Sequence, residues 1–155
     1  MTTETAALRL IVGLFEASPN QAMFSSVQAQ LGHGATLPEL ASAWLAGDLL
    51  QSPYYYPATL SDYQFAGLLV QRLLGLGEDY DWGAASDAVL ARDWLQQQVA
   101  SSGRGAATVA AIEQLCSTDA PAFAAARQHL LQQVTLAQDY LDSGGTATAA
   151  GDLLL

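Results

Sequence analysis

Apolar residues recur along the chain at the spacing of helix faces, and no segment alternates between apolar and polar positions as a half-buried strand would. Clusters of glycine, proline and serine separate the periodic segments. We therefore predict an all-α protein, a compact bundle of about seven helices. The predicted helices cover approximately residues 4–17, 19–31, 37–45, 60–75, 86–101, 106–117 and 120–142.

Several helix starts carry capping signals. Ser18, Pro19 and Gln21 predict a serine N-cap, a proline in the first turn and a capping-box glutamine. Further capping boxes are predicted for residues 36–39 and 61–64. These signals predict sharp boundaries for the second, third and fourth helices.

The fifth predicted helix illustrates how the core face is assigned. This helix carries Leu90, Trp94, Leu95 and Val99. We expect all four to face the core.

A weak internal similarity relates residues 27–31 to residues 95–99, each followed by a glycine break and a shorter helix. It suggests two three-helix units closed by a long C-terminal helix. The alternative is that any two amphipathic helices of one bundle look alike. We predict a helical domain over residues 1–143 and a flexible tail over residues 144–155.

The composition and net charge of the chain disfavour some classes of binding partner. The net charge is −10, and the five cations are all arginine. This charge disfavours binding to nucleic acids and to anionic lipids. Only 13% of the residues are charged, whereas 51% are hydrophobic. Either much of the surface carries small or neutral residues, or apolar surface is buried against another chain.

The sequence contains no recognisable catalytic motif, and we expect a non-enzymatic protein. His33 and His129 have no metal-ligand partner at helical spacing, and Cys116 falls on an apolar helix face. A small hydrolase with paired carboxylates is a less favoured alternative, because sequence spacing does not give the distance between carboxylates.

The acidic loop at residues 78–82 is the only place where a cofactor comes into question. Its oxygen ligands suit calcium, but an EF-hand would need a glutamate where Leu90 stands. An acidic, solvated loop is the alternative that we favour, so we expect no cofactor.

Aromatic residues supply the candidate binding site. Tyr54, Tyr55 and Tyr56 lie between two prolines, and Trp82 lies in the acidic loop. Such amphipathic rings suit a glycan or a protein partner. The alternative is that one or two of the tyrosines pack over the bundle.

The N-terminal region lacks the features of a signal peptide, because its short apolar run follows Glu4 and is interrupted by Arg9. No stretch reaches 18 uninterrupted apolar residues, so we expect no membrane span. The last four residues resemble the C-terminal motif of proteins exported by type I, ABC-type secretion systems. That resemblance implies a secretion signal formed by Asp152, Leu153, Leu154 and Leu155.

The body of the chain adds a second resemblance. Residues 14–20, Phe24, residues 31–34 and residues 40–45 resemble an all-helical domain of unknown function found in type I-secreted surface proteins, RTX-type adhesins and S-layer proteins. The chain departs from that pattern at residues 22–23 and lacks the glycine-aspartate repeats of RTX proteins.

This likeness implies an extracellular structural protein that self-assembles or attaches at the cell surface, in a surface layer, filament or biofilm matrix. Its partners would be itself, a cell-surface glycan or protein, and an ABC-type exporter. The alternative is a secreted binding module that uses the tyrosine loop.

Overall fold

The computed structural model describes residues 2–47, 55–83 and 86–144. Within these ranges the chain forms seven α-helices and one short 3₁₀ helix, and no strand. The prediction of an all-α fold is therefore confirmed. The elements are α1 (Thr3–Phe15), α2 (Gln21–Gly32), α3 (Leu37–Ala46), α4 (Asp62–Leu73), α5 (Asp87–Ser102), α6 (Arg104–Ser117), η1 (Pro121–Phe123) and α7 (Ala124–Asp142).

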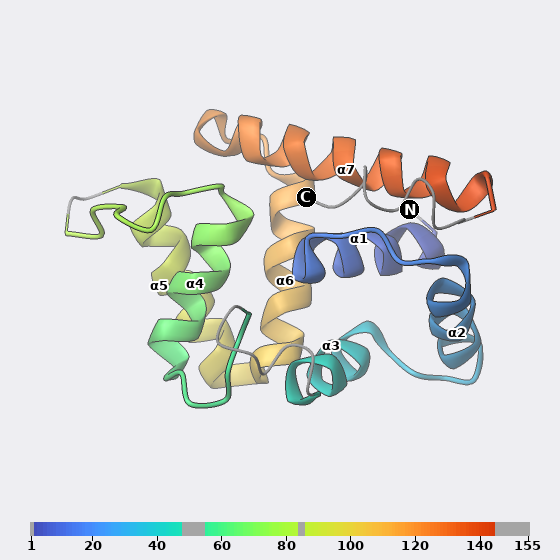
Figure 1. Ribbon diagram of the computed structural model, residues 1–155. Helices are drawn as coiled ribbons and strands as arrows, with labels where there is room; N and C mark the ends of the chain where they lie inside the picture. Colours follow the sequence, from blue (N-terminus) through green and yellow to red (C-terminus); the bar gives the residue numbers. More distant parts are fainter. Residues whose placement is uncertain (1, 48–54, 84–85, 145–155) are drawn as a thin grey trace.

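Helix α6 stands at the centre of the molecule (Figure 1). Helices α4 and α5 pack together on one side of it, while α1, α2 and α3 lie on the other. Helix α7 crosses one end of α6 and packs along α1. The strongest pairings are α3 with α6 and α4 with α5, followed equally by α1 with α7 and α5 with α6, so α6 links the two sides.

The core consists of two hydrophobic clusters that meet at α6. Ile112 and Leu115 belong to the cluster formed with α1, α2, α3 and α7. Ala107 and Ala111 belong to the cluster formed with α4 and α5. The second cluster also contains Leu14 of α1 and Leu45 of α3, so the clusters do not divide the helices into two units. The predicted repeat stays a prediction.

The contact between α3 and α6 is unusually close at Gly105. A Cβ atom placed on this buried glycine would collide with Ser42 Oγ and lie 2.6 Å from the carbonyl oxygen of Pro38. It would also lie 2.7 Å from the backbone nitrogen of Ser42. Only a hydrogen fits at this position, because two of these atoms belong to the backbone of α3.

Two of the predicted capping boxes are confirmed, those of residues 36–39 and 61–64. The serine cap predicted at Ser18 is wrong. Helix α2 is capped by Asn20, whose side chain accepts a hydrogen bond from Met23 N at 2.8 Å. The Ser18 hydroxyl instead donates to the Pro19 carbonyl at 3.1 Å. Ser18 and Asn20 are equally good N-cap residues, so the local sequence does not decide between them.

The core face predicted for α5 is only partly correct. Leu95 and Val99 are buried, but Leu90 is 66% exposed. The buried face of α5 instead runs through Ala88, Arg92, Leu95 and Val99. Because Arg92 occupies a core-facing position, Leu90 is rotated toward solvent.

Candidate functional site

The tyrosine loop lies partly inside the bundle. Tyr54 falls outside the described residues, and Tyr55 is half-buried. Tyr56 is only 2% exposed, and its ring packs edge-on against Phe65 with centroids 5.5 Å apart. Tyr56 therefore belongs to the core and offers almost no surface to a partner. This agrees with the alternative stated above, that one or two of the tyrosines pack over the bundle.

Arg72 holds the two described tyrosines at the end of α4. Its guanidinium carbon lies 4.9 Å from the ring centroid of Tyr56 and 5.7 Å from that of Tyr55. Burial raises the pKa of Tyr56 to about 12, although the positive charge of Arg72 opposes this rise. The Tyr56 phenol is therefore neutral in the folded protein across the physiological range.

The shifted pKa of Tyr56 predicts a loss of stability in alkali. Since the folded-state pKa lies above the ordinary value of 10, this contribution is intact below pH 10 and is lost as the pH rises toward 12. At pH 11 the free energy of unfolding should be lower by about 1.4 kcal/mol than at pH 9, beyond any loss seen in Tyr56→Phe. Urea denaturation of both proteins measures this difference. Equal losses in the two proteins would contradict the burial of the phenol.

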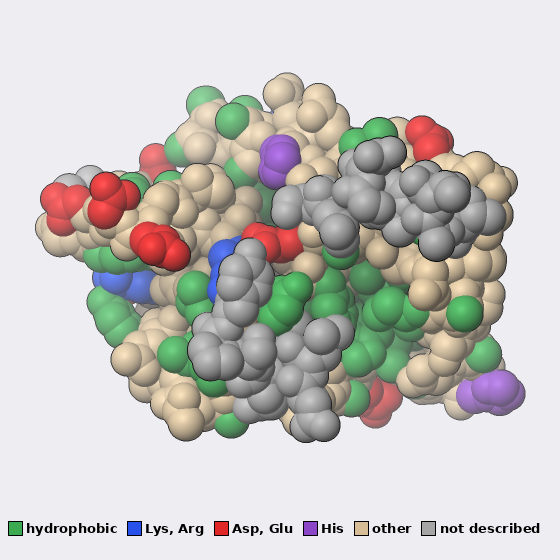
Figure 2. Space-filling view, in the orientation of Figure 1, with side chains coloured by type: hydrophobic (Ala, Val, Ile, Leu, Met, Phe, Trp, Pro, Cys, Tyr) green, Lys and Arg blue, Asp and Glu red, His purple; other side chains and the backbone are tan. Residues whose placement is uncertain are grey.

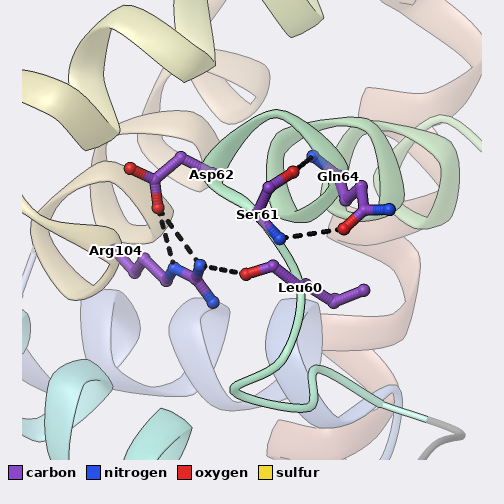
Figure 3. Close-up of polar contacts among 5 residues, drawn as sticks. All are labelled: Leu60, Ser61, Asp62, Gln64 and Arg104. Atoms are coloured by element: carbon purple, nitrogen blue, oxygen red, sulfur yellow. Dashed lines mark hydrogen bonds and ion pairs between the residues drawn. The ribbon is translucent and has the colours of Figure 1, made fainter.

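Arg104 ties the start of α4 to the start of α6 (Figure 3). Its Nη2 donates to the Leu60 carbonyl at 2.5 Å, and its Nε and Nη2 donate to Asp62 Oδ1 at 3.2 and 3.1 Å. The guanidinium carbon also lies 5.0 Å from the Phe65 ring centroid. These contacts fix the chain directly after the tyrosine loop, so they position Tyr56 against Phe65.

Trp82 contacts a different part of the bundle from the one that Tyr55 and Tyr56 contact. The Arg92 guanidinium, in a residue only 8% exposed, lies between the rings of Tyr63 and Trp82, at 4.5 and 4.7 Å from their centroids. Its Nε is 3.8 Å from Asp93 Oδ1. Tyr80 supports Trp82 edge-on, with centroids 5.0 Å apart. Trp82 therefore covers the buried guanidinium of Arg92, and this contact holds the acidic loop against α5.

The predicted aromatic residues that the structure describes, Tyr55, Tyr56 and Trp82, do not lie together in one site. Tyr55 and Tyr56 lie against Arg72 near the end of α4, whereas Trp82 faces Arg92 and Tyr63 near its start. Tyr63 and Arg72 are nine positions apart in α4, which corresponds to about 13 Å of helix. A single binding surface built from these aromatic rings is therefore not supported.

The acidic loop shows no metal site in the described part of the chain. Among those residues, no group of three histidine, cysteine or carboxylate side chains could hold a metal ion. The Asp81 carboxylate accepts a hydrogen bond from Gly83 N at 2.9 Å, which closes a local turn. Glu78 and Asp79 are exposed to solvent.

Cys116 and the two histidines are the described side chains with the greatest catalytic potential. Burial raises the pKa of the half-buried Cys116 thiol, which disfavours the reactive thiolate. His33 and His129 are both exposed. Four cavities lined by described residues contain at most one carboxylate each, so none of these four holds the carboxylate pair that the hydrolase alternative needs.

An apolar groove, which the sequence did not predict, opens between α5, α6 and η1. Two adjoining cavities of about 100 and 360 Å³ share Ala91, Trp94, Gln114 and Phe123. Leu95 and Leu115 extend the lining, Asp87 lies at one end, and the exposed Leu90 stands at its edge. We call this feature the α5–α6 groove. The apolar spacing predicts Leu90 in the core, so the sequence does not indicate a groove beside this residue.

The residues predicted to act in export, Asp152, Leu153, Leu154 and Leu155, lie outside the described residues, so their role stays a prediction. None of the described helices is both long enough and apolar enough to span a membrane. In comparisons with protein-family models, curated proteins and solved structures, no match to this chain was found.

Proposed function

We propose that this protein is non-enzymatic and self-associates, as a component of an extracellular surface layer, filament or matrix, and that copies meet at the α5–α6 groove. The observation that carries this proposal is the 66% exposed Leu90 beside an apolar groove. A large exposed leucine next to an unfilled apolar surface is typical of an interface. Trp94 and Phe123 provide aromatic walls of the kind enriched in interface centres.

The charge distribution favours a second copy as the occupant of the groove. The chain carries a net charge of −10, so two copies repel each other over most of their surfaces. Of the residues that line the groove, only Asp87 is charged. A symmetric dimer formed here brings few like charges together, and it allows Leu90 of each copy to enter the groove of the other.

Leu90→Asp tests this interface. The aspartate places a charge at the edge of the groove on both copies, so we expect at least about a hundredfold weaker association. Leu136→Asp is the matched control, because Leu136 is 48% exposed on α7, away from the lining of the groove. Sedimentation velocity gives the association constants. Equal weakening by both changes, or no effect of Leu90→Asp, would contradict the proposed interface.

The extracellular setting is supported by the sequence resemblances described above. Deleting residues 152–155 is expected to abolish export from cells that make the protein together with a type I exporter, without changing its thermal unfolding. Deletion of residues 146–149 is the matched control for shortening the tail. Normal export of the 152–155 deletion would rule out this signal.

A further inference from the structure

The positive charges of the chain lie away from the solvent. All five arginines belong to the described part of the chain, and none of them is exposed. Arg92 is buried. The half-buried arginines are Arg9, Arg72, Arg104 and Arg127. Two of these charges are paired with carboxylates, since Arg104 Nη2 lies 3.1 Å from Asp62 Oδ1 and Arg127 Nη1 lies 3.8 Å from Asp119 Oδ1.

The negative charges, in contrast, lie at the surface. Of the thirteen aspartates and glutamates that the structure describes, eleven are exposed, and only Glu16 and Glu113 are half-buried. On the face drawn in Figure 2, acidic side chains stand at several separate places, whereas basic side chains show only in small areas. Each copy therefore presents negative charge to its neighbours, with little exposed positive charge to offset it.

Asp87 brings this negative charge to the α5–α6 groove. It is exposed at one end of the groove, and none of the arginines lies within 4.0 Å of its carboxylate. Asp87 lies three positions before Leu90 on α5, which corresponds to about 4.5 Å along the helix. When Leu90 of one copy enters the groove of the other, Asp87 of the first copy also comes close to that groove. The interface therefore brings two like charges toward each other.

Salt determines how far these charges act. The Debye length is about 30 Å at about 10 mM salt and about 10 Å at about 100 mM salt. The 16 residues of α5 span about 24 Å, so at the lower salt concentration charges along the whole of this helix contribute to repulsion between copies. An interface between opposite charges weakens as salt is added, whereas an interface between copies of like charge becomes stronger.

We propose that ionic strength regulates self-association at the α5–α6 groove. Copies repel each other at low salt and associate as salt screens their charges, and Asp87 is the acid that opposes association most directly. This inference rests on the proposed function, because it concerns the same groove. It adds the regulation of that groove and the residue on which the regulation depends.

Sedimentation velocity of the unmodified protein at neutral pH tests the regulation. We expect association to be at least about tenfold tighter in about 300 mM sodium chloride than in about 10 mM. Equal or weaker association at the higher salt concentration would overturn the regulation but leave the interface in place. The absence of association at both salt concentrations would overturn the regulation and the proposed function together.

Asp87→Asn tests the assigned residue, and Asp139→Asn, at an exposed position of α7, is the matched control. Each change removes one negative charge per copy, so the two variants have the same net charge. In about 10 mM sodium chloride we expect Asp87→Asn to associate at least about threefold more tightly than Asp139→Asn. Equal association of the two variants would show that Asp87 has no special role. Circular dichroism checks that both variants are folded.

Discussion

Gly105→Ala is expected to destabilise the protein by more than about 3 kcal/mol, or to prevent folding altogether. The added methyl group would overlap Ser42 Oγ and lie 2.6 Å from the Pro38 carbonyl oxygen. These atoms cannot move aside singly, because the Pro38 carbonyl and the Ser42 nitrogen belong to one helix backbone. Helices α3 and α6 would have to separate along their whole contact, which links the two sides of the bundle. Urea denaturation followed by circular dichroism measures the loss.

Gly32→Ala is the control for this prediction. Gly32 is the last residue of α2, and no atom lies within 4 Å of the position that its Cβ would take. The change should be neutral or stabilising by up to about 1 kcal/mol, because alanine is the better helix former. If Gly105→Ala cost less than about 1 kcal/mol, the close approach of α3 to α6 would be incorrect.

Phe65→Ala should cost about 3 to 5 kcal/mol of unfolding free energy. Phe65 is fully buried and contacts both the Tyr56 ring and the Arg104 guanidinium. Removal of the ring leaves a cavity. It also removes the contacts that Phe65 makes with Tyr56 of the tyrosine loop and with Arg104 at the start of α6. The loss is therefore expected at the upper end of this range.

Phe123→Ala provides the comparison for Phe65. Phe123 is half-buried in η1 and borders the α5–α6 groove, so its removal should cost no more than about 2 kcal/mol. Denaturation curves of the two variants, measured side by side, give the difference. Equal costs would contradict the full burial of Phe65 against Tyr56 and Arg104.

The local elements of the fold could be predicted from the sequence because their signals are local. The capping boxes at residues 36–39 and 61–64 need only side chains three positions apart. The same reasoning failed at Ser18, where two neighbouring residues suit the cap and only the position of the first helical turn decides between them.

The candidate sites could not be predicted because they depend on contacts between distant segments. The apolar spacing predicts Leu90 in the core, yet Arg92 takes the inward position and contacts the rings of Tyr63 and Trp82. The aliphatic stem of arginine packs like an apolar side chain when rings cover its charge.

The mass of the unmodified protein in solution tests the central claim, that copies associate through the α5–α6 groove. Sedimentation velocity should give 16.3 kDa at low concentration and a rise to twice this mass, or more, as the concentration approaches about 1 mM. Leu90→Asp should remain near 16.3 kDa at the same concentrations. A monomer mass for the unmodified protein at every concentration would contradict the account.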